Sequence, residues 1–345
     1  MVNITRVLVA DDSPTQRQYL TDLIDEVPDL RVIGHAGNGL EAIALAQSLH
    51  PDIISMDIKM PRTDGLEATR QIMSQKPIPV VVVSGLLEDD IELSFKALDS
   101  GAIAVLPKPG SRNHPNFDQQ RQQLITTLRA MSKVKVVARR ERFQQSLTAS
   151  TPLAMRAQPE IIAIGTSTGG PRALHQLLTN LPTNLHVPVV VVQHMPHEFI
   201  PGLARWLSHV TPLEVTVAQQ GQELRAGQVI IAPGTHHLCV ERHGLKLVAR
   251  LSEEEYGQLY KPSVDVLFKS IVASCGPAAV GVIMTGMGND GALGLLAMRE
   301  RGAYTFSQDE YSSTVFGMPA AAIRVGAVEK AVSLSNLPSE IVKVL

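Results

Sequence analysis

The sequence predicts an α/β protein with two domains, each built on a parallel sheet. With 345 residues, the chain exceeds the usual size of a single hydrophobic core. Short apolar runs alternate with amphipathic helical patterns through both halves, which is typical of parallel strands covered by helices on both faces. A polar segment at 131–159 separates the halves, so we expect domains at 1–130 and 160–345 joined by a linker.

The composition is that of a globular protein and argues against binding of nucleic acid or insertion into a membrane. Hydrophobic residues make up 44% of the chain and charged residues 19%, as in globular proteins. The formal charge of −2 predicts no nucleic-acid partner, and the apolar runs are too short for membrane insertion. The N-terminus leads directly into a strand without a signal peptide, and Cys239 and Cys275 lack metal-ligand spacing. We therefore expect reduced thiols and a cytoplasmic location.

The first domain shows five strand-and-helix repeats. Helical patterns occupy the intervals between strands, for example at 14–27 and 39–49. The expected strands are Val7–Val9, Arg31–Ala36, Ile53–Asp57, Val80–Ser84 and Ala104–Leu106. A (βα)5 order of this kind places functional groups at the carboxyl ends of the strands.

Polar residues stand at four of these strand ends. They are Asp11 and Asp12, Asp57, Ser84 and Lys108. Three carboxylates at one point repel each other unless a cation joins them, and oxygen ligands suit Mg²⁺. The lysine and the hydroxyl would then contact a phosphoryl oxygen. Taken singly, either of the first two aspartates could cap a helix and the lysine could be solvated, but five such residues in one domain favour a shared site.

The first domain as a whole resembles the receiver domain of two-component response regulators. The resemblance rests on Asp11-Asp12-Ser13, the segment 56–61 followed by Asp64-Gly65, Ser84-Gly85 and Lys108-Pro109. It implies a flavodoxin-like fold in which a histidine kinase phosphorylates Asp57. It also implies Mg²⁺ bound by Asp11, Asp12, Asp57 and the Lys59 carbonyl, with Ser84 and Lys108 sensing the phosphoryl group. Val105 replaces the aromatic residue common in receivers, which leaves the aromatic-rotation part of the signal open.

The second domain again alternates strands and helices. Leu238–Glu241 and Leu245–Ala249, around His243-Gly244, predict an antiparallel hairpin beside a doubly wound parallel sheet. The expected parallel strands are Ile161–Gly165, Val187–Gln193, Val229–Ala232 and Ala279–Thr285. The expected helices are Pro171–Leu181, Glu198–Ser208, Ser263–Cys275 and Asp290–Arg301.

The turn after the first of these strands carries the motif G-x-S-x-G, formed by Gly165, Ser167 and Gly169. A serine on a tight strand-to-helix turn presents its hydroxyl and the neighbouring N–H groups in the same direction, which suits a nucleophile. The dinucleotide-binding pattern fails because its second glycine would fall at Ser167, and no Lys-Ser/Thr pair follows Gly170 as a P-loop requires. A purely structural turn remains the alternative from this motif alone.

Two further residues at strand ends complete a possible catalytic triad. His194 follows one buried strand, and Asp290 follows another inside a glycine-bracketed segment. A histidine can take and return the serine proton, and an aspartate can orient that histidine. Alone, His194 is one of 11 histidines and Asp290 could cap a helix. Together with Ser167 they predict a hydrolase whose order, Ser-His-Asp, differs from that of α/β-hydrolases.

The second domain resembles the catalytic domain of chemotaxis protein-glutamate methylesterases, the CheB family. The matching segments are 164–170, 193–196, 231–234, 261–265 and 285–291. The resemblance implies that Ser167 is the nucleophile, His194 the base and Asp290 its orienting partner. It further implies that the Met287 N–H stabilises the oxyanion and that Thr168 helps hold His194. The family commonly has Ala where this chain has Thr166.

The resemblance also implies an activity and its partners. We expect phosphorylation-controlled hydrolysis of glutamate methyl esters on methyl-accepting chemoreceptors, with release of methanol, and deamidation of receptor glutamines. Hydrolysis needs no cofactor, so Mg²⁺ belongs to the receiver. One alternative is a DNA-binding output domain, which the absence of net positive charge disfavours. The other is a catalytically inactive adaptor that only binds receptors.

Overall fold

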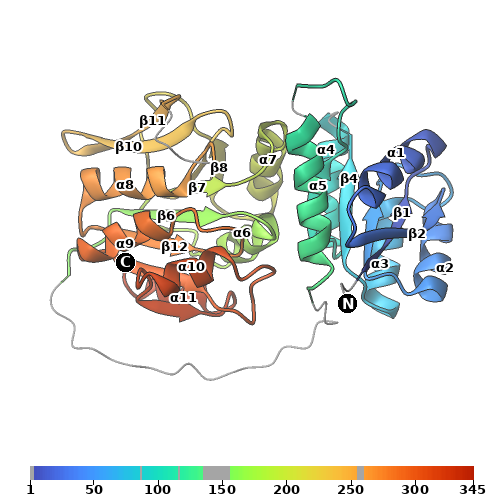
Figure 1. Cartoon of the computed structure of the whole chain (residues 1–345). Helices are drawn as coiled ribbons and strands as arrows, with labels where there is room; N and C mark the ends of the chain where they lie inside the picture. Colours follow the sequence, from blue (N-terminus) through green and yellow to red (C-terminus); the bar gives the residue numbers. More distant parts are fainter. Residues whose placement is uncertain (1–3, 86–87, 116, 135–155, 255–259) are drawn as a thin grey trace. The chain divides into compact units, whose positions relative to one another are not determined.

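A computed structural model describes residues 4–85, 88–115, 117–134, 156–254 and 260–345 (Figure 1). The chain divides into two compact units, Met1–Phe143 and Gln144–Leu345. Most of the predicted linker, residues 135–155, lies outside the described ranges. Within the described ranges, every helix is too short or too polar to cross a bilayer.

The first unit contains a five-stranded parallel sheet in the order β2-β1-β3-β4-β5. This is the flavodoxin-like order, so the predicted (βα)5 fold is confirmed. Its strands are β1 (Thr5–Ala10), β2 (Leu30–Ala36), β3 (Ile53–Met56), β4 (Val80–Ser84) and β5 (Ala104–Pro107). Its helices are α1 (Pro14–Asp25), α2 (Gly39–Leu49), α3 (Gly65–Gln75), α4 (Glu88–Asp99) and α5 (Phe117–Met131).

Local sequence signals set the helix starts of this unit. The side chains of Ser13, Asn38 and Asp64 each accept a hydrogen bond from the third residue of the helix that follows. Such caps satisfy N–H groups that the first helical turn leaves without partners. The first helix cap is Ser13 itself, which leaves the carboxylates of Asp11 and Asp12 for another role.

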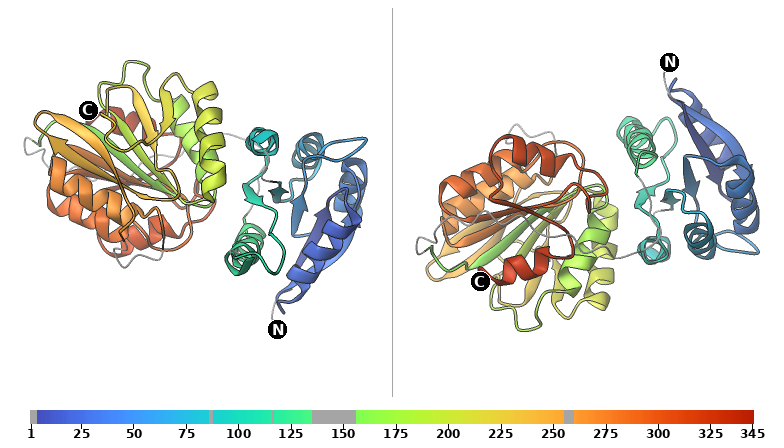
Figure 2. Two further views of the ribbon diagram at one scale, coloured as in Figure 1. Left: turned by 90° about the horizontal axis from the view of Figure 1, so that it is seen from above. Right: turned by 90° about the horizontal axis from the view of Figure 1, so that it is seen from below.

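The second unit contains a seven-stranded parallel sheet in the order β14-β13-β12-β6-β7-β9-β8. Helices cover both of its faces (Figure 2). Its strands are β6 (Ile161–Thr166), β7 (Val189–Gln193), β8 (Glu214–Val217), β9 (Gln228–Ile231), β12 (Ala279–Ile283), β13 (Tyr304–Gln308) and β14 (Lys330–Val332). Its helices are α6 (Gly170–Thr179), η1 (His197–Phe199), α7 (Ile200–Val210), α8 (Val264–Cys275), α9 (Ala292–Glu300), α10 (Met318–Arg324) and α11 (Leu337–Val342).

The predicted hairpin is confirmed as a separate two-stranded sheet, β10 (His237–His243) and β11 (Lys246–Ser252). It packs on α8, where the Val240 N–H donates to the Ser270 hydroxyl at 2.9 Å. Strands β8, β13 and β14 were not predicted from the sequence. These strands lack a continuous apolar run, and β8 and β14 lie at the two edges of the sheet, where burial on both faces is not required.

Strand β6 occupies the functional centre of this sheet. The chain leaves β6 toward β7 on one side, and β12 pairs with β6 on the other side. Ligands of open α/β sheets bind at such a switch in strand order, outside the carboxyl ends of the strands. The buried residues on β6 and β12 include Ile161, Ala163, Ala279 and Ile283, which anchor these strands in the core.

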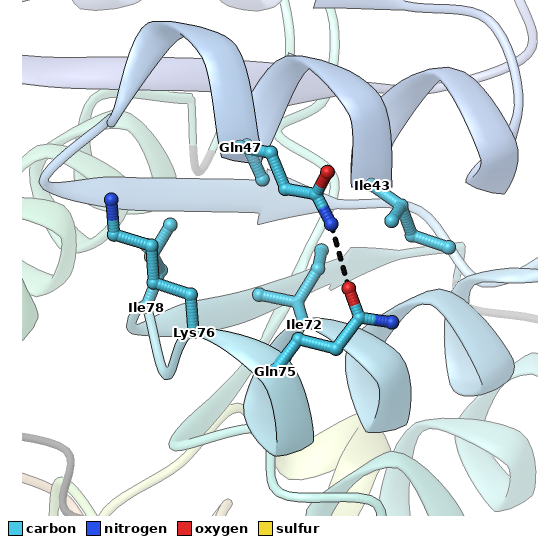
Figure 3. A pocket seen from close by; sticks show the side chains of 7 residues that line it. Ile43, Gln47, Ile72, Gln75, Lys76 and Ile78 are labelled. Carbon is cyan, nitrogen blue, oxygen red and sulfur yellow. Dashed lines mark hydrogen bonds between the residues drawn. The ribbon is translucent and has the colours of Figure 1, made fainter.

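A small pocket in the first unit lies between α2 and α3 (Figure 3). Gln47 and Gln75 form a hydrogen bond of 2.6 Å across it, and Ile43 and Ile72 also line it. The pocket is close to the C-terminal ends of both helices and to Ile78, just before β4. It is therefore at the edge of the sheet opposite to the strand ends where functional residues gather.

The first prediction concerns Gly65 at the start of α3. A Cβ atom at this position would overlap the carbonyl oxygen of Asp57, and this oxygen belongs to rigid backbone. Gly65→Ala should therefore lower the unfolding free energy of the first unit by about 1–3 kcal/mol, as overpacking does. Urea denaturation measures the change. Gly37→Ala is the matched control, because a Cβ atom there meets only ordinary contacts at 3.5 Å. Equal losses in the two variants would contradict the prediction.

Candidate functional site

The first unit brings together the polar residues predicted at its strand ends. Oxygen atoms of Asp11, Asp12 and Asp57 lie within 4.8 Å of one another. The Lys108 Nζ lies 2.7 Å from a carboxylate oxygen of Asp11 and equally far from one of Asp57. Lys108 is thus ion-paired and not a solvated surface residue.

Burial sets the electrostatics of this cluster. It raises the pKa of Asp57, against the opposing effect of Lys108. Burial alone would lower the pKa of Lys108, but the contacts with Asp11 and Asp57 outweigh it, so that pKa is raised and the ammonium stays charged. Three carboxyl groups around one ammonium leave an excess of negative charge. The donor set therefore fits a divalent cation with a preference for oxygen ligands.

The other predicted receiver residues are close to this cluster. Ser84 is buried at the end of β4, and its carbonyl accepts the Lys108 N–H at 2.8 Å. The second oxygen of Asp57 accepts the N–H of Ile58, the residue before Lys59. Val105 is buried within β5 and pairs with Val82 of β4.

In the second unit, Ser167 lies on the turn between β6 and α6. Its N–H donates to the Thr285 carbonyl at 3.0 Å, and its own carbonyl accepts the Gly170 N–H at 2.8 Å. The left-handed residue of the turn is Gly169, with φ of 78°. A Cβ atom there would lie 2.5 Å from Thr314, so conformation and space both require glycine. Ser167 is half-exposed, as a nucleophile must be.

The partly buried His194 and the buried Asp290 form a pair beside this turn. The His194 Nε2 lies 2.8 Å from an Asp290 carboxylate oxygen. The His194 N–H donates to the Thr166 carbonyl at 3.0 Å, which places the histidine next to the residue preceding Ser167. Its Nδ1 is buried and makes no hydrogen bond within the part of the chain that the structure describes. Nδ1 is therefore the ring nitrogen that Asp290 leaves available for proton transfer.

The imidazole has a further neighbour that the sequence analysis missed. The ring of Tyr260 stacks on that of His194, with 4.7 Å between centroids and an angle of 12° between planes. Tyr260 is about 38% exposed. No sequence signal identifies this contact, because it joins two residues far apart in the chain.

Asp290 is held by the first turn of α8. Its carboxylate accepts hydrogen bonds from the Ser263 hydroxyl at 2.8 Å, the Val264 N–H at 2.7 Å and the Asp265 N–H at 3.0 Å. Burial works to raise the pKa of Asp290, but His194 and these N–H groups outweigh it and keep the pKa low. Asp290 therefore accepts from the first N–H groups of α8, whose N-cap residue is Ser263, and it does not cap the α9 helix that follows it.

His237 supports the same arrangement from β10. Its Nδ1 accepts the N–H of Ser263 at 3.1 Å, which requires an unprotonated nitrogen. Burial, and then the charge of Lys261, lower the pKa of His237 and favour that neutral form. The segment 261–265 is one of those that resemble the family, and its sequence alone predicts no role. The structure shows that it supplies three donors to Asp290.

The turn after β12 lies next to Ser167. A Cβ atom on Gly286 would lie 2.7 Å from the Ser167 Cβ, so this turn is in close contact with the serine. Within the described ranges, the N–H groups of Thr168 and Met287 donate no hydrogen bond. They are free to stabilise an oxyanion. The Thr168 carbonyl accepts from the Thr285 hydroxyl at 2.9 Å, whereas the predicted support of His194 by Thr168 stays a prediction.

The second prediction tests the hydrogen bond from the Ser263 hydroxyl to Asp290. The Ser263 hydroxyl donates to Asp290, and as the N-cap of α8 it also accepts the Val266 N–H. Ser263→Ala removes both hydrogen bonds. We expect a loss of about 1 kcal/mol in unfolding free energy together with a lower kcat for a small ester. Asn38→Ala, which removes a helix cap in the other unit, should cost similar stability and leave kcat unchanged. Equal kcat values in the two variants would show that the hydrogen bond from Ser263 to Asp290 does not contribute to catalysis.

Comparison with known proteins agrees with this geometry. Residues 162–341 match the family model for CheB methylesterase, and residues 7–114 match that for the response regulator receiver domain. The chain is 44% identical to protein-glutamate methylesterase/protein-glutamine glutaminase 4 of Myxococcus xanthus, over 97% of this chain and 96% of that protein. A protein-glutamate methylesterase/protein-glutamine glutaminase of Nitrosospira multiformis is 41% identical over 97% of each chain.

A solved structure shows the same fold for the second unit. The crystal structure of the Thermotoga maritima CheB methylesterase catalytic domain superposes with a TM-score of 0.53 at 33% identity. The match covers 55% of this chain and 100% of that domain. With a receiver domain in front of a methylesterase domain, and with relatives aligned over nearly its whole length, this chain belongs to the CheB methylesterase family.

Proposed function

We propose that this chain hydrolyses glutamate methyl esters on methyl-accepting chemoreceptors and deamidates receptor glutamines, under control of phosphorylation at Asp57. The observation that carries the proposal is the His194–Asp290 pair at 2.8 Å, held beside the Ser167 turn. The names of the relatives support the choice of substrate, because they combine methylesterase and glutaminase activities.

In the proposed acylation step, the Ser167 hydroxyl attacks the ester carbonyl. His194 accepts the hydroxyl proton at Nδ1, the nitrogen that Asp290 does not occupy. Asp290 stabilises the resulting imidazolium through Nε2, and its low pKa keeps it charged in that role. The free N–H groups of Thr168 and Met287 stabilise the oxyanion. His194 then returns the proton to the leaving methanol.

In the deacylation step, water attacks the acyl-enzyme and His194 again takes the proton. The products are a free glutamate side chain and the restored serine. A glutamine side chain enters by the same route, with ammonia as the leaving group. Both reactions end in glutamate, so one site supports both activities in the relatives' names.

For the first unit we propose that Asp57 accepts a phosphoryl group from a histidine kinase. Asp11, Asp12, Asp57 and the Lys59 carbonyl would hold Mg²⁺, which neutralises the charge that gathers during phosphoryl transfer. Ser84 and Lys108, at the ends of neighbouring strands, would contact the phosphoryl oxygens. A kinase partner and receptor segments as substrate are consistent with a cytoplasmic location.

An inactive adaptor that only binds receptors is the competing proposal. It does not account for the hydrogen bonds that hold the buried, ionised Asp290 on His194. Keeping a buried carboxylate charged is costly unless every oxygen has partners, and a surface used only for binding does not need it.

The third prediction concerns the nucleophile. Ser167→Ala should reduce methanol release from methylated receptors by on the order of 10⁶-fold, as loss of the serine does in other hydrolases of this kind. Folding should be unaffected, because the side chain is half-exposed. Ser208→Ala, an exposed serine on α7, is the control. Methanol release near the wild-type rate from Ser167→Ala would support the adaptor.

The fourth prediction concerns the receiver. Acetyl phosphate should label the chain only with Mg²⁺ present, since the clustered carboxylates repel a phosphoryl donor without it. Asp57→Asn should abolish the label and the increase in methanol release that phosphorylation causes. Asp118→Asn, an exposed carboxylate at the start of α5, should keep both. Label that persists in Asp57→Asn would place the acceptor elsewhere.

A further inference from the structure

Gln193, the last residue of β7, directly precedes His194 and is hydrogen-bonded to the backbone of both Ser167 and His194. It pairs with Thr166, the residue before Ser167, across the parallel ladder. Its side chain is 1% exposed. The side-chain Nε2 donates to the Ser167 carbonyl at 2.8 Å and to the His194 carbonyl at 2.9 Å. One amide group thus joins the backbones of the predicted nucleophile and the predicted base.

The chemistry of the partners determines which way this amide points. Both partners are carbonyl oxygens, which only accept, so the NH₂ end must face them and both of its hydrogens are used. The amide oxygen faces the other way, toward Gly170 in the first turn of α6. A Cβ atom on Gly170 would overlap that oxygen, so the glycine leaves the space that the side chain needs. The positive end of the α6 dipole lies on the same side.

We propose that Gln193 is a positioning residue that fixes the distance and angle between Ser167 and His194. The two residues directly follow two neighbouring strands, β6 and β7, and within the described ranges the Ser167 hydroxyl makes no hydrogen bond to His194. Their alignment therefore depends on the backbone, through the His194 N–H to the Thr166 carbonyl and through the Gln193 amide. The inference rests on the proposed function, since it assigns Gln193 to the same serine and histidine.

A second glutamine occupies the equivalent place on the opposite side of the central strands. Gln308 ends β13, beside β12, and its amide oxygen accepts the Thr285 N–H at 2.9 Å. Its NH₂ end donates to the Ser312 carbonyl at 2.6 Å. In both cases a buried side-chain amide at the end of one strand binds the turn that follows a neighbouring strand. Gln193 of β7 binds the turn after β6, and Gln308 of β13 binds the turn after β12. Gln193 differs in that it reaches both the serine and the histidine.

The test replaces Gln193 by Met, which is unbranched and of similar length but has no donors. Misplacement of reacting groups by about 1 Å can cost 10²-fold in rate. We therefore expect Gln193→Met to lower kcat for receptor methyl esters by about 100-fold with KM nearly unchanged. The rate at which a fluorophosphonate labels Ser167 in the full chain should fall in parallel, because labelling also requires the aligned base.

Thr211→Val is the matched control, since it removes a buried hydrogen bond from the Thr211 hydroxyl to the Leu178 carbonyl between α6 and α7. We expect it to lower the thermal midpoint without loss of kcat. A similar kcat in both variants, or a change confined to KM, would overturn the role of Gln193. If the wild-type chain is labelled by fluorophosphonate but releases no methanol from receptors, the proposed substrate fails. The labelling rate of Gln193→Met then still tests the positioning role.

Discussion

The buried carboxylate of Asp290 is the interaction on which the geometry of the second unit depends. It accepts hydrogen bonds from His194 and from three donors at the start of α8. This one side chain, on the turn after β12, therefore connects that turn with the residue that follows β7 and with the start of α8. A buried charge without such partners would be neutralised or expelled to solvent. The position of α8, and of the hairpin that supplies His237, is therefore coupled to the orientation of the imidazole.

The two units use the same edge of a parallel sheet for opposite electrostatic purposes. In the first unit, three carboxylates and Lys108 gather at the strand ends, an arrangement suited to a cation and a phosphoryl group. In the second, the Asp290 carboxylate accepts hydrogen bonds at both of its oxygens, and the N–H groups of Thr168 and Met287 donate no hydrogen bond within the described ranges. The same topology supports both because the strand ends leave the sheet and bring loop residues together.

Close backbone approaches keep the second site rigid. Gly169 takes a left-handed conformation against Thr314, and Gly286 lies against Ser167. The buried amides of Gln193 and Gln308 hold the two turns that flank the reacting serine. Catalysis by orientation needs such fixed turns, because small displacements of the nucleophile reduce the rate steeply.

The sequence by itself determined the two-domain α/β class and the polar residues at the strand ends, since these follow from local patterns of apolar runs and the residues that end them. The flavodoxin-like fold of the first unit was implied by the resemblance to receiver domains, and the structure supplied its strand order. The sequence did not identify the strands β8, β13 and β14, which lack such apolar runs. Only the tertiary structure decided that Asp290 accepts from the start of α8, that it pairs with Nε2 of His194, and that Tyr260 stacks on the His194 ring while Gln193 binds the His194 carbonyl. These contacts depend on which strands and helices become neighbours in space, and no periodicity along the chain encodes that.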